Sequence, residues 1–92
     1  MLDFEWDEDK AVSNHEKHGV SFEEASTVFD DPLAIVFNDL DRSINEQRFI
    51  IIGESKDDEL LFVVYTERND KFRIIGAREA TRRERRWYEE RN

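Results

Sequence analysis

The sequence contains no cysteine, only one proline and only three glycines among its 92 residues. Without cysteine, neither a disulfide framework nor a thiolate metal site can form. The scarcity of proline and glycine, together with 38% hydrophobic and 12% aromatic residues, is typical of a folded chain rather than a disordered one. At this length we expect a single domain, residues 1–92, with a small core.

Long apolar runs and cofactor motifs are also missing. The longest apolar run, Leu60–Tyr65, is far shorter than the roughly 20 residues that span a bilayer. The first ten residues are acidic and lack the basic and apolar segments of a signal peptide. The chain has no P-loop, dinucleotide fingerprint or nucleophile elbow. We therefore expect a cytoplasmic protein that has no membrane contact and uses no cofactor.

Charge is distributed unevenly along the chain, whose net charge is −9. Residues 1–72 hold seven Lys and Arg against nineteen Asp and Glu, whereas residues 73–92 hold seven Arg against four Glu. A basic end on an acidic body can attract an anionic ligand locally. The alternative is that these charges solvate an exposed helix and pair with their own neighbours.

Capping signals predict two N-terminal helices. The first has Asp7 as its N-cap, runs to about Lys17 and closes at Gly19. The second begins at Ser21, which forms a capping-box pattern with the glutamate three positions later, and ends at the Asp-Asp-Pro tripeptide. The segment "FEW" before the first helix is either a short strand or a lid over the core.

Short β-branched and aromatic runs separated by polar turns predict strands in the middle of the chain. They cover residues 33–38, 48–53, 60–66 and 72–78. Thr81, with a glutamate three positions later, predicts a last helix that runs to the terminus. The expected fold is α+β, with two N-terminal helices, a four-stranded antiparallel meander and a C-terminal helix. Because the central strands are apolar on both faces, we expect helices on one face and the last helix or a partner on the other.

The last strand, "FRIIGAR", carries residues of functional interest. Alternation assigns its residues to two faces: Phe72, Ile74, Gly76 and Arg78 to one, and Arg73, Ile75 and Ala77 to the other. Gly76 leaves space beside Arg78, where a ligand could approach. The alternative is a bulge, with Arg78 paired to a glutamate.

Three arginines could form an anion site if the fold brings them together. Arg68 lies in the predicted turn after the third strand, and Arg73 and Arg78 lie in the fourth. Guanidinium groups bind phosphate oxygens in pairs and stay charged at physiological pH. Taken singly, each arginine is equally well explained as a solvated or ion-paired side chain.

The two histidines, His15 and His18, lie near the end of the first predicted helix. A metal site with Glu8 is conceivable in geometry, but two histidines without a recognised third ligand are a weak zinc signal, so no metal is expected. A histidine can also act as a general acid or base. A further alternative is that His18 caps the helix end and packs under Val20.

The order of motifs resembles the BrnT family, the toxin half of type II toxin–antitoxin pairs. The likeness spans residues 4–90 and rests on "FEWD", "KHGVSFEEA", "VFDDPLA", "RFIIIG", "YTER" and "RIIGAREATRRERRWYEE". It implies a compact RelE-like fold and a metal-independent endoribonuclease that arrests translation. It also implies neutralisation by a small BrnA-like antitoxin, which dimerises and binds operator DNA.

The resemblance also implies site residues. The family's "KHGV", "TER" and "ISAR" segments map to Lys17 and His18, to Glu67 and Arg68, and to residues 75–78, where Gly76 replaces the usual serine. The expected catalytic residues are Lys17, His18, Glu67, Arg68 and Arg78. The expected RNA-binding residues are Arg73, Arg82, Arg83 and Arg86.

The expected reaction is attack of a ribose 2′-OH on the adjacent phosphate. A base near His18 or Glu67 would take the proton, while Arg68 and Arg78 would stabilise the charge on the phosphate oxygens. The basic C-terminal end would line the RNA cleft, and the acidic remainder would face a basic antitoxin. One alternative is an inactive binding module that forms a repressor complex with its antitoxin. Another is a structural subunit of a homodimer.

Overall fold

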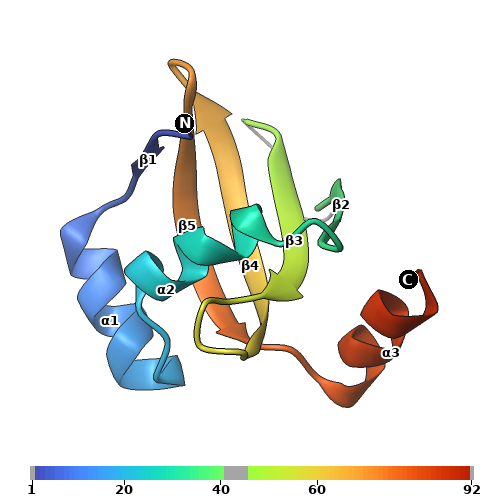
Figure 1. Cartoon of the computed structure of the whole chain (residues 1–92). Coiled ribbons are helices and arrows are strands. Elements are labelled where there is room, and N and C mark those ends of the chain that lie inside the picture. Colours follow the sequence, from blue (N-terminus) through green and yellow to red (C-terminus); the bar gives the residue numbers. More distant parts are fainter. Residues whose placement is uncertain (1, 41–45, 92) are drawn as a thin grey trace.

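The computed structural model describes residues 2–40 and 46–91. Helices near the N-terminus precede most of the sheet, and a further helix ends the chain (Figure 1). In chain order the elements are β1 (Phe4–Glu5), α1 (Glu8–His18), α2 (Phe22–Thr27), the 3-10 helix η1 (Val28–Asp30), β2 (Ile35–Asn38), β3 (Arg48–Glu54), β4 (Leu60–Arg68), β5 (Lys71–Glu79) and α3 (Arg82–Glu90). The predicted α+β class is confirmed.

The first helix, α1, has the predicted ends. The side chain of Asp7 accepts a hydrogen bond from the Lys10 amide at 3.0 Å, which satisfies one free donor of the first turn. Gly19 closes the helix with a φ of 71°, a left-handed conformation that glycine adopts at little cost. The chain therefore turns back toward the sheet directly after His18.

The second helix, α2, begins at the predicted N-cap, Ser21, whose hydroxyl accepts a hydrogen bond from the Glu24 amide. The carboxylate of Glu24 accepts a hydrogen bond from the hydroxyl of Ser55 at 2.8 Å instead of returning to the N-cap. The predicted capping box is therefore only half formed. Glu24 ties α2 to the loop after β3.

The sheet has five strands in the order β1-β5-β4-β3-β2. Strands β2 to β5 pair antiparallel in sequence order, as the predicted meander does, but β1 pairs parallel to β5 (Figure 1). The "FEW" segment thus forms a strand rather than a lid. The sheet is mixed and five-stranded, and the expectation of a purely antiparallel four-stranded sheet is corrected.

The sheet carries apolar side chains on both faces. On the face that we call the α1 face, Phe22, Ala25 and Val28 of α2 and η1 are fully buried against β3, β4 and β5. On the other, the α3 face, Tyr88 of α3 packs with a cluster that includes Ile52. The helix α3 covers only one end of this face of the sheet. The other end is accessible to solvent and contains a groove.

Strand β5 contains a bulge. Tyr65 of β4 lies opposite Ile74, whereas the preceding residue, Val64, lies opposite Gly76. Ile75 therefore has no partner across the ladder. An extra residue of this kind resets the alternation of side chains beyond it.

The bulge decides which residues share a face. Ile74 and Ala77, three positions apart, are both buried in the core of the α1 face. Arg73 and Arg78, five positions apart, both lie on the α3 face, because each is opposite a β4 residue of that face. The strict alternation of side chains predicted for residues 72–78 is therefore wrong. The alternative prediction, a bulge in this strand, is confirmed.

The two strand glycines have different surroundings. A Cβ atom at Gly53 in β3 would lie 2.8 Å from Val28 Cγ1 and 2.9 Å from Ala34 Cβ, so only glycine fits there. A Cβ atom at Gly76 would meet only the Asn14 side-chain oxygen, at 3.9 Å. Gly53 is thus required by packing, whereas Gly76 leaves room for a side chain.

Candidate active site

A groove of about 540 Å³ lies on the open part of the α3 face. Its lining residues are Asn14 and His18 of α1, Asp39 directly after β2, Arg48 and Ile50 of β3, Phe62 and Val64 of β4, and residues 75–78 of β5. The floor is apolar, the rim carries arginines, and α1 reaches it at the β5 edge. It brings together segments from the whole length of the chain.

Cross-strand register gathers arginines on the α3 face. Arg48 on β3 lies opposite Thr66 on β4, which lies opposite Arg73 on β5. Directly opposite residues share a face, so the two arginines flank Thr66, which is buried. Arg68 is two residues beyond Thr66 on the same strand and points to the same face. Three guanidinium groups therefore lie at the end of this face that α3 does not cover.

Carboxylates of the same chain hold two of these arginines. Arg68 pairs with Glu46 at 2.8 Å and Arg73 pairs with Glu5 at 3.0 Å. The hydrogen bond from Arg68 is the largest cause that lowers the pKa of Glu46, and the charges of Arg48 and Arg73 act in the same direction. The Arg68–Glu46 pair is exposed and contributes little to stability, whereas the Arg73–Glu5 pair is partly buried.

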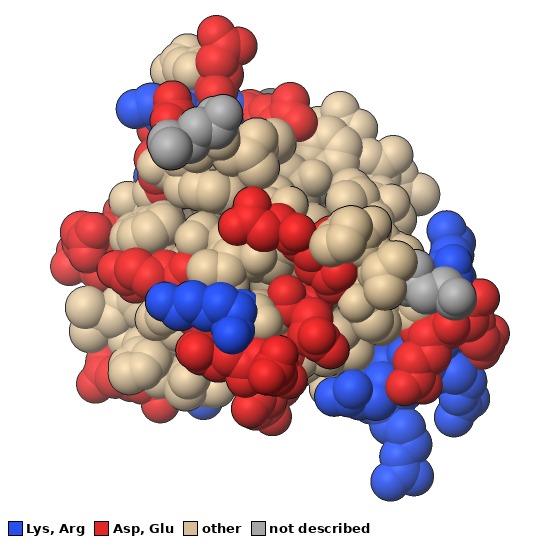
Figure 2. Space-filling view, in the orientation of Figure 1, with Lys and Arg blue, Asp and Glu red and all other residues tan. Residues whose placement is uncertain are grey.

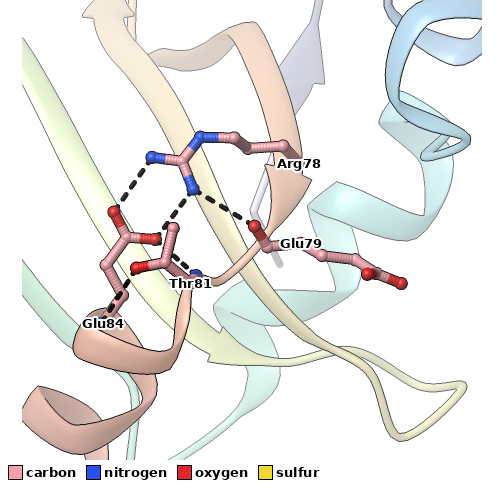
Figure 3. A network of polar contacts seen from close by, with 4 residues as sticks. All are labelled: Arg78, Glu79, Thr81 and Glu84. Atoms are coloured by element: carbon pink, nitrogen blue, oxygen red, sulfur yellow. Dashed lines mark hydrogen bonds and ion pairs between the residues drawn. The ribbon is translucent and has the colours of Figure 1, made fainter.

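Arg78 lies at the other end of the groove and is held more firmly (Figure 3). Its Nη1 and Nη2 donate to Glu84 Oε1 and Oε2 at 2.8 and 2.9 Å, and Nη1 also donates to the Glu79 carbonyl at 3.1 Å. The guanidinium carbon lies 3.9 Å from the centre of the Phe62 ring. A bidentate ion pair and a ring contact together fix the plane of the guanidinium.

Glu84 is buried, with 8% of its surface exposed. Burial alone would raise the pKa of Glu84, but the hydrogen bonds from Arg78 and from the Thr81 amide outweigh it, and the pKa lies below its ordinary value. Glu84 also completes the predicted capping box of α3 with Thr81. One carboxylate thus caps α3 and holds Arg78 in place (Figure 3).

Asn14 fastens α1 to the outer edge of β5. Its Oδ1 accepts from the Ala77 amide at 3.1 Å, and its Nδ2 donates to the Ala77 carbonyl at 2.8 Å and to the Val20 carbonyl at 3.0 Å. The side chain therefore supplies the pairing that a neighbouring strand would otherwise give at this position. It fixes β5 between the bulge and Arg78.

His18 is the last residue of α1 and lines the groove, where it is exposed. An imidazole can accept and release a proton near neutral pH.

Among the described residues, no group of three His, Cys, Asp or Glu side chains is placed to hold a metal ion. No helix of the described part is long and apolar enough to cross a membrane.

Three expected catalytic residues are not part of the groove lining: Lys17, Glu67 and Arg68. Lys17 is exposed on α1 and is not part of the lining. Glu67 neighbours Arg68 on β4 and so points to the α1 face. The side chains of Glu67 and Arg68 therefore lie on different faces of the sheet, because consecutive residues of a strand point to opposite faces.

The expected RNA-binding residues of the last helix do not reach the groove either. Arg82, Arg83 and Arg86 are exposed on α3, and none belongs to the lining. Arg83 lies over the ring of Trp87, 5.6 Å from its centre. Figure 2 shows basic side chains gathered at α3 with acidic side chains among them, and further acidic side chains over the visible face of the molecule.

Three residues of the site were missed by reasoning from the sequence. Arg48 is the first residue of β3. Because alternate residues of a strand point to the same face, its spacing of two from Ile50 indicates that both side chains lie on one face of the sheet. Asn14 gave none, because a single amide in a helix is usually a surface residue. Glu84 was predicted as a capping residue, and its contact with Arg78 depends on the path between β5 and α3.

Comparison with known proteins relates this arrangement to a family. A family model described as "Ribonuclease toxin, BrnT, of type II toxin-antitoxin system" matches residues 6–84. The crystal structure of the Brucella abortus ribonuclease toxin BrnT is similar to this chain, with a TM-score of 0.67 and 24% sequence identity, over 89% of this chain and 100% of that one. At this identity, the structural likeness shows the fold alone. No curated protein matches the chain.

Proposed function

The chain belongs to the BrnT family of ribonuclease toxins of type II toxin–antitoxin systems, and from this premise we propose that it is an endoribonuclease that cuts RNA in the groove of the α3 face. The observation that carries the proposal is the shared face of Arg48, Arg68, Arg73 and Arg78, which the bulge in β5 makes possible. A groove with an apolar floor between arginines can hold a nucleobase and the phosphates on either side of it.

The proposed reaction needs no metal. His18 accepts the proton of a ribose 2′-OH, and the 2′-oxygen attacks the adjacent phosphorus. The bond from phosphorus to the 5′-oxygen breaks, this oxygen takes up a proton, and a 2′,3′-cyclic phosphate remains. Arg78 and Arg48 stabilise the negative charge that grows on the phosphate oxygens. Lys17, Glu67 and Arg68 are given no part in these steps.

The acidic composition is compatible with an RNA substrate because half of the Lys and Arg residues lie in the last twenty positions of the chain. Acidic side chains spread over the α1 face, whereas the arginines of α3 lie at one end of the molecule (Figure 2). In this proposal, Arg82, Arg83 and Arg86 attract the RNA backbone near the groove without entering it. The acidic α1 face is left for a basic partner.

A toxin of a type II system has an antitoxin partner. We propose that the antitoxin is BrnA-like, forms dimers, binds operator DNA and covers the acidic α1 face. The RelE-like layout, the arrest of translation and a cytoplasmic location belong to the same proposal. A homodimer of this chain is a separate possibility, which light scattering on the purified protein tests.

A cleavage assay tests the ribonuclease proposal. Purified protein is incubated with total RNA, with and without ribosomes, and compared with Arg78→Ala and with Arg85→Ala as a matched control from the exposed face of α3. We expect the wild type and Arg85→Ala to cut alike, and Arg78→Ala to lose about 100-fold or more in rate and to lose growth arrest in cells. Full cleavage by a folded Arg78→Ala protein would contradict the proposed role.

One observation favours a second function. Arg68, Arg73 and Arg78 each pair with a carboxylate of the same chain, as in a protein that has no anionic ligand to hold. The chain would then be an inactive binding module that forms a repressor complex with its antitoxin. Absence of cleavage by the wild-type protein, with or without ribosomes, together with antitoxin-dependent binding to operator DNA, would support this function.

A further inference from the structure

The guanidinium of Arg78 uses only part of its hydrogen-bonding capacity inside the protein. An arginine has five N–H groups. Nη1 donates both of its hydrogens, to Glu79 and Glu84, and Nη2 donates one, to Glu84 (Figure 3). The Nε–H and the second hydrogen of Nη2 remain, and no described residue accepts a hydrogen bond from them. These two lie on the same edge of the planar group.

The remaining edge is suited to phosphate. Two parallel N–H groups of a guanidinium match two oxygens of one phosphate. The side chain of Arg78 is 34% exposed and lines the groove, so a ligand there can reach it. Arg78 can therefore hold Glu84 by one edge and a phosphate by the other at the same time. The carboxylate does not compete with RNA for this arginine.

The contacts of Glu84 determine where that edge points. The carboxylate is buried, and its Oε1 also accepts from the Thr81 amide at 2.9 Å. Glu84 is thus fixed at the start of α3, and Phe62 supports the guanidinium from below at 3.9 Å. The plane of Arg78 is determined by a rigid carboxylate and a ring rather than by mobile surface groups.

We propose that Glu84 is a positioning residue for RNA cleavage, which orients Arg78 so that its Nε–Nη2 edge takes one phosphate group of the RNA. The inference rests on the proposed ribonuclease function. It assigns a role in cleavage to a residue that touches no substrate itself.

The first test compares Glu84→Gln with Tyr88→Phe. Glutamine keeps the shape and one acceptor oxygen but is uncharged and turns an N–H₂ group toward Arg78, which removes the ion pair and one of the two hydrogen bonds. Tyr88→Phe removes the 2.6 Å hydrogen bond from the Tyr88 hydroxyl on α3 to Asp31. It does not change the contacts between Arg78 and Glu84. We expect Glu84→Gln to lower kcat/KM by about ten- to hundredfold, because small misplacements of a catalytic group have effects of that size. Tyr88→Phe should lower the unfolding temperature and keep kcat/KM within twofold.

The second test observes Arg78 directly by NMR. A short 2′-O-methyl oligoribonucleotide, which cannot be cleaved, is titrated into the 15N-labelled protein, and the Nε–H signal of Arg78 is assigned with Arg78→Lys. We expect this signal to shift on binding in the wild type and to respond at least fivefold less in Glu84→Gln. Equal responses in both proteins, or equal cleavage by both, would overturn the positioning role.

The two tests separate this inference from the proposed function. A wild-type protein that cuts no RNA refutes ribonuclease activity, and the NMR titration then still decides whether Glu84 orients Arg78 toward phosphate. A wild-type protein that cuts RNA, together with an equally active Glu84→Gln, leaves the function standing and removes Glu84 from it.

Discussion

Replacing Asn14 by alanine should both destabilise the fold and disturb the groove. Asn14 makes three hydrogen bonds, two to Ala77 and one to Val20, at 2.8–3.1 Å. At about 0.5–1.5 kcal/mol for each bond, and with up to about 0.7 kcal/mol returned by the better helix propensity of alanine, we expect a net loss of about 1–4 kcal/mol. In a domain of this size that corresponds to a fall of roughly 10 °C in the unfolding temperature.

The assay is urea unfolding followed by circular dichroism, with Ser13→Ala as the control. Ser13 lies on the same helix, is exposed and has no part in these bonds, so its change should stay within about 0.5 kcal/mol. Asn14→Asp should lose more than Asn14→Ala, because a carboxylate would face two carbonyl oxygens. An Asn14→Ala protein as stable as Ser13→Ala would show that Asn14 does not hold the β5 edge.

Three further predictions concern single features. Gly76→Ser should change stability by less than about 0.5 kcal/mol, whereas Gly53→Ser should lose about 2 kcal/mol or more because of its close contacts; equal losses in urea unfolding would contradict the packing. Burial raises the pKa of Asp31, but hydrogen bonds from neighbouring groups lower it by more, so the folded pKa lies below the ordinary value. The contribution of Asp31 to stability is therefore present above about pH 4 and lost as the pH falls through the folded pKa. The difference in unfolding free energy between wild type and Asp31→Asn should therefore shrink below pH 4, and a constant difference would contradict this. Arg73→Ala should reduce the slope of log affinity against log salt for single-stranded RNA by about 0.7, the effect of one lost phosphate contact, and an unchanged slope would exclude Arg73 from the RNA surface.

Reasoning from the sequence was most successful where the cause is local. The ends of α1, the start of α2 and the capping box of α3 depend on residues within four positions of one another, and the structure has all of these except the second half of the α2 box. The four predicted strands are also present. The short β1 stayed undecided because a two-residue strand forms only where a neighbour such as β5 offers an edge.

The composition of the groove was harder to predict because it depends on register. The bulge at Ile75 moves Arg78 to the face of Arg73, and nothing in the residues around it shows on which side of Gly76 the extra residue falls. Likewise, the contact between Asn14 and Ala77 joins positions 63 residues apart. The charge asymmetry indicated a basic region correctly, but it did not separate the arginines on α3 from those on the strands.

The location of bound RNA can be measured directly in a crystal of this protein with a 2′-O-methyl oligoribonucleotide. We predict that the RNA lies on the α3 face, with one phosphate within hydrogen-bond distance of the Arg78 Nε–Nη2 edge, a second near Arg48 and a 2′-oxygen near His18. RNA bound only along the outer surface of α3 or across the α1 face, with the groove empty, would contradict the assignment of the groove as the cleavage site.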